Sequence, residues 1–348
     1  MKKCNKQHYT LFFYLAILVV LAFGGINLDD KTSEKNTALS AHHEQKTVRI
    51  GFPGISNSTL EAGGIAINQQ YFIEELAKVG FKPEIVFFQQ AGPALNEALA
   101  SDKIDVALYG DLPIAILRTK GAPVKVFAID NSRLQFGTIV QSESPAKNIA
   151  ALQGEKVIFG KGTVQQRYFK EITQFYGLNP DKFEMVNAVG ADANSVFSGQ
   201  QAEAMFTFYY TVLYMQQKGM GKVIDSTLDK PELSSQSLAV GREIFLQENP
   251  QAAVAIIRAL QRAKQFASQN PEQVFKIFSQ NNIPADIYRQ AYSADLSFSN
   301  FDPRITQESV NKLSRLIDFL VENKLVNNRI NVEELITTEY YERFLQEK

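Results

Sequence analysis

Two short polar segments follow apolar runs that are typical of buried strands, and their residue types suit anion binding. The first contains Ser56, Asn57 and Ser58, and the second contains Gly162 and Thr163. Where a strand leads into a helix, free backbone N–H groups and the helix dipole favour a negative charge. Ser58 also has capping-box spacing to the glutamate three residues later, so helix capping alone explains that residue equally well. We expect all five residues to contact a ligand.

Two further residue pairs end predicted strands. Gly110 and Asp111 end one strand, and Phe208 and Tyr209 end another. Asp111 suits either a helix cap before a Leu-Pro pair or a ligand contact, where its carboxylate would attract an amine and repel an anion. The two aromatic residues suit either the core or one wall of a ligand cleft. We expect all four to contact the ligand, and Arg133 is either solvated or available to pair with an anion.

Several kinds of chemistry are excluded by what the sequence lacks. The segment around Lys161 is not a nucleotide-binding Walker loop, because Gly154 lies one residue too far from Gly160 and a glycine follows the lysine. Cys4 and all three histidines precede the first predicted strand, so the folded part has no thiolate nucleophile, cysteine metal site or histidine base. We therefore expect no catalytic residue, no bound metal and no cofactor.

The whole chain has the composition of an ordinary globular protein with two domains. It has 348 residues, of which 45% are hydrophobic, and this is enough sequence for two separate cores. The formal net charge is -1 and no long run of one sign appears, so a nucleic-acid partner is not expected.

The elements that position these residues occur twice. The segment from Ala91 to Asp111 returns as Val189 to Tyr209, with an offset of 98 that aligns Gly92 with Gly190 without a gap. Each copy predicts a short helix, a turn and a buried strand whose carboxyl end lies where open α/β sheets bind ligands. The alternative is chance similarity between βα units. Two related lobes would face each other across a cleft.

Strands and helices alternate along the rest of the chain, which predicts an α/β fold with a mostly parallel sheet in each lobe. The simplest topology leaves the first lobe near Asn131 and returns near Ser235, with the C-terminal helices on the first lobe. This assigns residues 47–132 and 237–348 to lobe 1 and residues 133–236 to lobe 2. Two crossings between the lobes predict a hinge.

The N-terminus has the pattern of an export signal. Lysines precede the uninterrupted apolar run from Leu11 to Ile26, and small residues allow cleavage near Gly24. An uncleaved anchor is the alternative, although about 16 apolar residues are fewer than the roughly 20 of a usual membrane span. Cys4 precedes the apolar run, so lipidation is not expected. Residues 27–46 follow as a polar leader, and the protein is expected to be periplasmic or otherwise extracytoplasmic, tethered to the membrane if the signal stays.

The order and spacing of several segments resemble one known family. These are VRIGFPG from Val48, AGPALNEALASDKIDVALYGDLP from Ala91, VIFGKGT from Val157, GADANSVFSGQQAEAMFTF from Gly190 and LSRLIDFLVENKLVNNRINVE from Leu313. Together they are similar to the periplasmic substrate-binding component of an ABC importer, in the group for aliphatic sulfonates, nitrate and taurine. The resemblance covers nearly the whole mature chain. It implies a two-lobed type II periplasmic-binding-protein fold, a monomer, and a membrane permease with its ATPase as partners.

The resemblance also implies a role for the residues at the strand ends. Similar proteins hold an oxyanion with hydroxyl and backbone N–H groups from both lobes, which correspond here to Ser56 to Ser58, Gly110-Asp111 and Gly162-Thr163. One departure concerns the ligand's tail, since sulfonate binders often have a Trp-Asp pair where this chain has Phe208-Tyr209, and this chain has no tryptophan.

The expected function is capture of a small organic anion, above all an aliphatic sulfonate. Nitrate, taurine or a pyrimidine vitamin precursor are alternative ligands for the same fold. An enzyme of the related pyrimidine-synthesis kind is disfavoured by the missing histidine and cysteine and by the export signal. An anchored sensor remains the alternative if the apolar segment is uncleaved.

Overall fold

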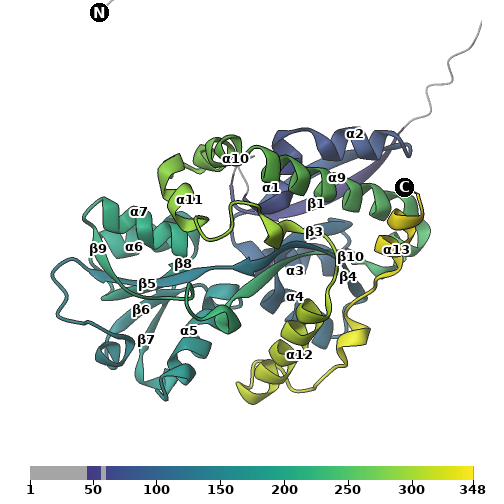
Figure 1. Cartoon of the computed structure of the whole chain (residues 1–348). Coiled ribbons are helices and arrows are strands. Elements are labelled where there is room, and N and C mark those ends of the chain that lie inside the picture. The colour runs from purple at the N-terminus through teal and green to yellow at the C-terminus, as the bar shows by residue number, and fades with distance from the viewer. Residues whose placement is uncertain (1–44, 56–59, 348) are drawn as a thin grey trace, which may run out of the picture. The chain divides into compact units, whose positions relative to one another are not determined.

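Two five-stranded sheets form the centre of the computed structural model, which describes residues 45–55 and 60–347 (Figure 1). The first sheet has the order β2-β1-β3-β10-β4. Its strands are β1 (Lys46–Pro53), β2 (Phe81–Phe88), β3 (Val106–Gly110), β4 (Val124–Leu134) and β10 (Ser235–Arg242). The second sheet has the order β7-β6-β8-β5-β9. Its strands are β5 (Phe136–Gln141), β6 (Lys156–Phe159), β7 (Glu184–Asn187), β8 (Ala204–Phe208) and β9 (Gly221–Ser226).

Each sheet is mixed, with a single strand opposed to the other four. In the first sheet β1 is parallel to β2 and β3, while β10 is antiparallel to both β3 and β4. In the second sheet β6 is parallel to β7 and β8, while β5 is antiparallel to both β8 and β9. The opposed strand is in each case the one that enters from the other sheet. The prediction of two mostly parallel sheets with two crossings is therefore confirmed, and the crossings account for the exceptions.

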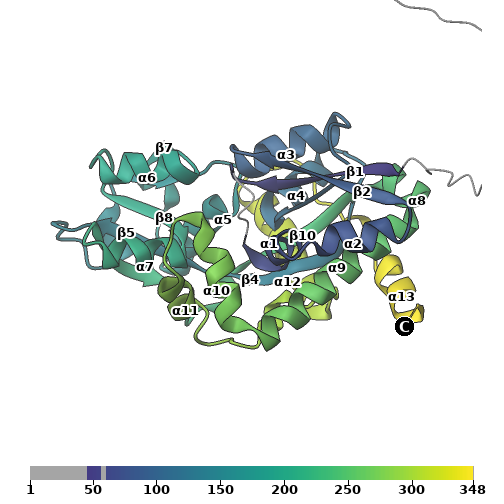
Figure 2. The same ribbon diagram turned by 90° about the horizontal axis from the view of Figure 1, so that it is seen from above.

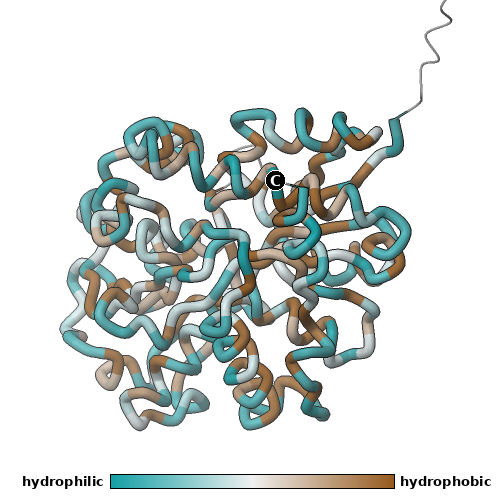
Figure 3. The backbone as a smooth tube through the Cα atoms, turned by 45° about the vertical axis from the view of Figure 1, so that its right-hand side comes forward, coloured by the Kyte–Doolittle hydropathy of each residue, from teal (hydrophilic) through white to brown (hydrophobic). Residues whose placement is uncertain are grey.

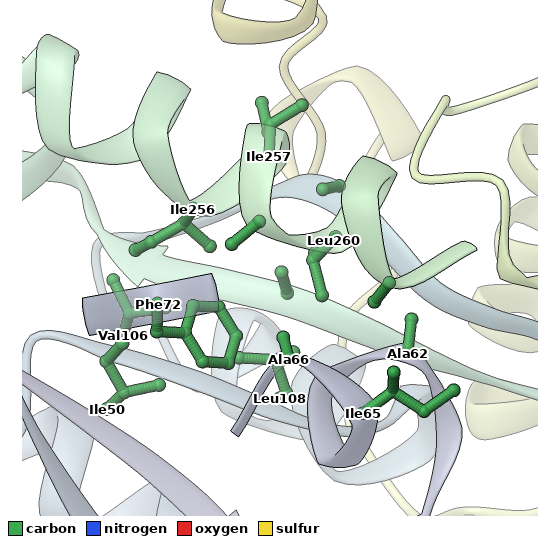
Figure 4. Packing of buried hydrophobic residues seen from close by; sticks show 14 of the residues in the cluster. Ile50, Ala62, Ile65, Ala66, Phe72, Val106, Leu108, Ile256, Ile257 and Leu260 are labelled. Carbon is green, nitrogen blue, oxygen red and sulfur yellow. The ribbon is translucent and has the colours of Figure 1, made fainter. Parts of the chain in front are cut away.

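Helices cover both faces of the first sheet. One face is covered by α1 (Glu61–Asn68), α2 (Tyr71–Ala77) and α9 (Pro250–Gln269), and the other by α3 (Ala91–Ala100), α4 (Asp111–Thr119) and α12 (Gln307–Glu322). Figure 4 shows the first of these cores, where Ile50 and Val106 of the sheet pack below Ile256 of α9. Several buried alanines on α9 keep its side chains short, which lets the helix approach α1 and α2 closely.

The second sheet is covered in the same manner. Helix α5 (Val164–Phe175) contributes to the core on one face, and α6 (Gly190–Ser198) and α7 (Tyr209–Gln217) contribute to the core on the other. Figure 2 gives the view from above. In Figure 3 the hydrophobic stretches run through the inside of the fold, whereas hydrophilic residues gather on its outer turns. No helix in the described part of the chain is long and apolar enough to cross a membrane.

The internal repeat seen in the sequence is present in the structure. Adding 98 to the bounds of β3 gives those of β8, and adding 98 to the bounds of α4 gives those of α7. Helices α3 and α6 agree to within one residue. The two strand-to-helix junctions at Gly110 and Phe208 are therefore structural counterparts.

The C-terminal helices do not all behave as expected. We call the first sheet with its covering helices the first half, and the second sheet with its covering helices the second half. Helices α9, α12 and α13 (Glu339–Gln346) pack on the first sheet, whereas α10 (Pro271–Phe278) leads into α11 (Ala285–Ala291), which packs on α7 of the second half. Ile287 and Ala291 bury their side chains there against Leu213. The remaining α-helix of the described residues is the short α8 (Glu243–Glu248). The C-terminal segment thus contacts both halves.

Candidate functional site

A cavity of about 340 Å³ is lined by residues from both sheets and from the C-terminal segment. The first half contributes, among others, Phe52, Leu60, Glu61, Tyr109, Gly110, Asp130 and Ser237. The second half contributes, among others, Phe159, Thr163, Gln165, Asn194, Thr207, Phe208 and Tyr210, and the C-terminal segment contributes Asn281, Ile283 and Tyr288. Of the predicted site residues, Gly110, Thr163 and Phe208 line this cavity. Ser56, Asn57 and Ser58 lie outside the described residues.

Gly110 brings the two halves into contact at the edge of the cavity. A Cβ atom added to Gly110 would lie 2.3 Å from Cγ1 of Val164, the first residue of α5. Such a distance is far below van der Waals contact, so only glycine permits this approach. The predicted role for Gly110 was a backbone contact with the ligand, and its position on the cavity wall is compatible with that role.

Asp111 is directed away from the cavity, toward a cation of the other half. It is fully buried, and its carboxylate accepts hydrogen bonds from Nη1 of Arg167 at 2.6 Å and from the backbone N–H of Gln236 at 3.0 Å. The alternative of a helix cap was wrong, because Gly110 occupies the capping position and Asp111 is the first helical residue. The guanidinium draws the carboxylate away from the helix end. Asp111 does not line the cavity.

The ion pair at Asp111 belongs to a buried network that joins α4 to α5. Arg167 is 2% exposed, and its Nε also donates to Glu171 at 2.9 Å. Burial alone would lower the pKa of Arg167, but the neighbouring carboxylates of Glu171 and Asp111 raise it above its usual value. Burial raises the pKa of Glu171. Removing one member of such a pair leaves an uncompensated buried charge, which costs about 3–5 kcal/mol.

The Gly162-Thr163 junction is largely saturated by internal hydrogen bonds. Thr163 caps α5, since its hydroxyl accepts the N–H of Gln165 at 3.2 Å and donates to the carbonyl of Gly160 at 2.7 Å. Gly162 has a φ of 75°, which glycine adopts without strain, and its N–H donates to Gln166 at 2.7 Å. Gly162 does not line the cavity. Little donor capacity is therefore left here for an oxyanion.

The aromatic wall of the cavity is displaced by one residue from the predicted pair. Phe208 lines the cavity and stacks on Phe136 at 5.4 Å and on Tyr210 at 5.5 Å between ring centroids. Tyr210 also lines the cavity, whereas Tyr209 lies in a smaller neighbouring one. The strand ends at Phe208 and α7 begins at Tyr209; both tyrosines line the smaller cavity, and Tyr210 also reaches the larger one.

Arg133 lines the smaller cavity rather than the larger one. Its Nη2 donates to the carbonyl of Leu228 at 3.1 Å, and its buried Nε has no hydrogen-bond partner in the part of the chain that the structure describes. The protein itself thus accepts part of the hydrogen bonds that the Arg133 guanidinium can donate. The pairing of Arg133 with an anion stays a prediction.

Two carboxylates that were not among the predicted site residues face the larger cavity. Asp130 of β4 is 3% exposed and accepts hydrogen bonds from the N–H of Gly63 and the hydroxyl of Ser237, both at 2.7 Å. Glu61 begins α1 and lies near Asn131, whose side chain opposes the rise in the pKa of Glu61. The sequence feature that could have indicated this arrangement is the glycine pair Gly63-Gly64, which follows Glu61. A Cβ atom at Gly63 would lie 3.2 Å from Oδ1 of Asp130, so glycine lets α1 approach β4.

The environment raises the pKa of both carboxyl groups. Burial raises the pKa of Asp130 to about 6, and burial together with the charge of Asp130 raises the pKa of Glu61 well above its ordinary value. Among the described residues that line the cavity there is no lysine, arginine or histidine. No group of three or more His, Cys, Asp or Glu side chains suited to a metal ion occurs in the described part of the chain.

A family model described as NMT1/THI5 like matches residues 65–274. The chain belongs to the NMT1/THI5-like family. Two relatives named for binding aliphatic sulfonates are each 22% identical to it. The one from Bacillus subtilis (strain 168) aligns over 90% of this chain and 92% of its own length, and the one from Escherichia coli (strain K12) over 92% and 96%. The family resemblance predicted from the sequence is therefore confirmed.

Solved structures support the same fold. A sulfonate-binding periplasmic protein from Methylobacillus flagellatus KT superposes with a TM-score of 0.71 at 25% identity, covering 87% of this chain and 95% of its own. The alkanesulfonate-binding protein from Xanthomonas axonopodis pv. citri, bound to MOPS, gives 0.73 at 16% identity, with 84% and 99% covered. The predicted periplasmic-binding-protein fold of this NMT1/THI5-like chain is confirmed.

The cavity of this NMT1/THI5-like protein has room for a compact solute. Rings from Phe208 and Tyr210 offer an apolar surface, while Asp130 and Glu61 offer acceptors at the opposite half. The hydroxyl of Tyr288 is buried beside the same cavity and has no hydrogen-bond partner among the described residues. A few polar groups placed in a mainly apolar cavity are typical of small-molecule sites.

Proposed function

We propose that this protein is an extracytoplasmic solute-binding component of an ABC importer, which holds a small organic solute and delivers it to a permease and its ATPase. The observation that carries the proposal is the cavity of about 340 Å³ lined from both sheets. Family membership and the sulfonate-binding relatives support it. Binding without catalysis is part of the proposal, because Cys4 and the three histidines all precede the first strand.

Closure of the two halves around the solute is the proposed mechanism. Two bodies would move about the β4–β5 and β9–β10 connections, as in hinge closure. One body comprises residues 47–132 and 237–348, and the other comprises residues 133–236. Such a closed state needs contacts between the bodies, which are the packing of Gly110 against Val164 and the ion pair of Asp111 with Arg167. Because α11 packs on α7, the C-terminal segment would take part in this motion.

The first ligand to test is an aliphatic sulfonate. This choice is supported by the names of the relatives and by the MOPS-bound neighbour. Thr163 would then donate its hydroxyl to the oxyanion in place of the carbonyl of Gly160, and Ser56 to Ser58 are the other proposed oxyanion contacts. The described lining of the cavity favours a second candidate, a cation, because its carboxylates are Glu61 and Asp130.

Thermal unfolding of the full chain with a panel of solutes tests the proposal. The panel contains methanesulfonate, longer alkanesulfonates, taurine, nitrate, sulfate and hydroxymethylpyrimidine. A ligand that binds only the folded state adds about 2.7 kcal/mol of stability at 100 times its dissociation constant. The stabilisation should vanish in Phe208→Ala and persist in Ser195→Ala, a control on the exposed side of α6. Stabilisation that persists in Phe208→Ala would place binding outside the cavity and contradict the proposal.

A further inference from the structure

We propose that the cavity takes an organic cation, with a protonated amine or amidine at Glu61 and Asp130 and an apolar body against Phe208 and Tyr210. The inference rests on the proposed function, since it names the class of solute that the same cavity would bind. It differs from the sulfonate expectation in the sign of the ligand's charge.

The distribution of charge around the cavity carries the first step. Glu61 and Asp130 line it together, and the lining residues described by the structure include no lysine, arginine or histidine. Within the described residues, the donors to Asp130 are neutral groups, the N–H of Gly63 and the hydroxyl of Ser237. A buried carboxylate without a cationic partner is costly, and a cationic ligand would remove that cost. An oxyanion in the same space would instead face two acidic groups.

The groups around Glu61 and Asp130 do not supply the positive charge that a ligand would bring. Tyr210, Tyr288 and Tyr292 lie close to Glu61, and burial raises the pKa of all three hydroxyls, which keeps them neutral. Arg133 and Asp295 line the smaller cavity, which also borders Glu61. Asp295 accepts hydrogen bonds from Ser297, Ser299 and Asn300, and the guanidinium of Arg133 donates to the carbonyl of Leu228.

The protonation state of the pair agrees with this assignment. The pKa of Asp130 lies at about 6 and burial raises that of Glu61 as well, so near pH 6 the pair holds a proton that ordinary carboxyl groups would have released. An opposite charge nearby lowers the pKa of a carboxyl group. Binding of a cation should therefore release that proton to the solvent.

The aromatic residues supply the second, independent observation. Phe208 and Tyr210 stack with an interplanar angle of 7°, and Tyr288 follows at 5.3 Å from Tyr210. The hydroxyl of Tyr288, a fully buried residue that lines the cavity, has no hydrogen-bond partner in the described structure. A ligand N–H group would satisfy this oxygen, and the rings attract cations through their π-faces.

Three ligands of nearly the same shape and different charge test the inference. Benzamidine is a cation, benzamide is neutral and benzoate is an anion. Calorimetric titration of the full chain should give affinity for benzamidine at least about tenfold above that for benzamide, with benzoate weakest, because a buried charge pair strongly affects affinity. Repeating the titration in buffers of different ionisation enthalpy should reveal the released proton. An alkylamine and the matching alkanesulfonate form a second pair with the same expected order.

Variants then locate the effect. Glu61→Gln and Asp130→Asn should each lower benzamidine affinity at least about tenfold and reduce the proton release. Glu143→Gln, which neutralises an exposed carboxylate away from the cavity, is the matched control and should bind as the parent does. Circular dichroism establishes that each variant is folded. If Asp130→Asn does not fold, Glu61→Gln alone decides.

The possible failures are distinguishable. Binding of alkanesulfonates or benzoate without binding of the cations would overturn the charge assignment and leave the solute-binding function standing. Cation binding that is unchanged in both variants would also overturn the assignment, since the site would lie elsewhere. Absence of binding by every cation, neutral compound and anion tested would overturn both proposals.

Discussion

The two copies of the internal repeat have the same backbone and different chemistry at the same junction. Gly110-Asp111 stands between β3 and α4, and Phe208-Tyr209 stands between β8 and α7, 98 residues later. The first pair holds the other half of the molecule, through the contact with Val164 and the ion pair with Arg167. The second pair supplies an aromatic side chain to the cavity. One junction thus specialises in contact between the halves and the other in contact with the solute.

The carboxylates show the same asymmetry. Asp130 in β4, at one edge of the first sheet, faces the cavity, and its donors in the described part of the chain are the neutral N–H of Gly63 and hydroxyl of Ser237. Asp225 in β9, at the corresponding edge of the second sheet, is paired with Lys230 at 3.2 Å and accepts from the hydroxyl of Tyr176 at 2.6 Å. The unpaired acidic groups therefore lie on the first half and most of the aromatic wall on the second. A solute with one charged end and one apolar end would match this division.

The largest expected effect comes from breaking the ion pair between the halves. Asp111→Ala leaves Arg167 buried without this partner, and we expect a loss of about 3–5 kcal/mol in the free energy of unfolding. Urea denaturation measures it. Asp181→Asn, at an exposed aspartate of the second half, should change stability by no more than about 0.5 kcal/mol. A loss below about 1 kcal/mol for Asp111→Ala would mean that water or Glu171 compensates the guanidinium.

A methyl group at the glycine junction should separate the halves. Gly110→Ala places a Cβ 2.3 Å from Val164, and overpacking of this kind costs about 1–3 kcal/mol. We expect a larger radius of gyration by X-ray scattering and weaker solute binding. Adding Val164→Ala should restore both, because it removes the atom that the new methyl group meets. An unchanged radius of gyration in the single variant would show that the helix moves and the halves stay together.

The unpaired carboxyl on the first half predicts a pH dependence. The pKa of Asp130 is about 6 in the folded state and near 3.9 when unfolded, so the folded protein binds more protons between these values. Stability should therefore fall by about 1–3 kcal/mol as the pH rises from 4 to 7, and Glu61 adds to the same trend. Asp130→Asn, which keeps an acceptor for Gly63, should flatten the profile. A profile that is equally steep in this variant would assign the trend to other groups.

The sequence predicted the backbone better than the chemistry of the site. Apolar periodicity and the repeat depend on neighbouring residues, so the alternation of strands and helices and the position of Thr163 at the start of α5 could be predicted. The partner of Asp111 could not, because Arg167 comes from the other half and nothing local selects it. Asp130 was missed for the same reason, since its hydrogen bond to Gly63 joins residues 67 positions apart.

The smallest expected effect concerns the start of α5, which Gly110 and Asp111 contact. Thr163→Ala removes the hydroxyl that accepts the N–H of Gln165, and the lost cap should cost about 1 kcal/mol. Thr163→Ser keeps that hydroxyl and should lower the free energy of unfolding by about a few tenths of a kcal/mol. Urea denaturation compares the two, and solute titration separates capping from ligand contact. If both variants bind the solute as the parent does, Thr163 acts only on the helix; if binding falls in Thr163→Ala alone, its hydroxyl also contacts the solute.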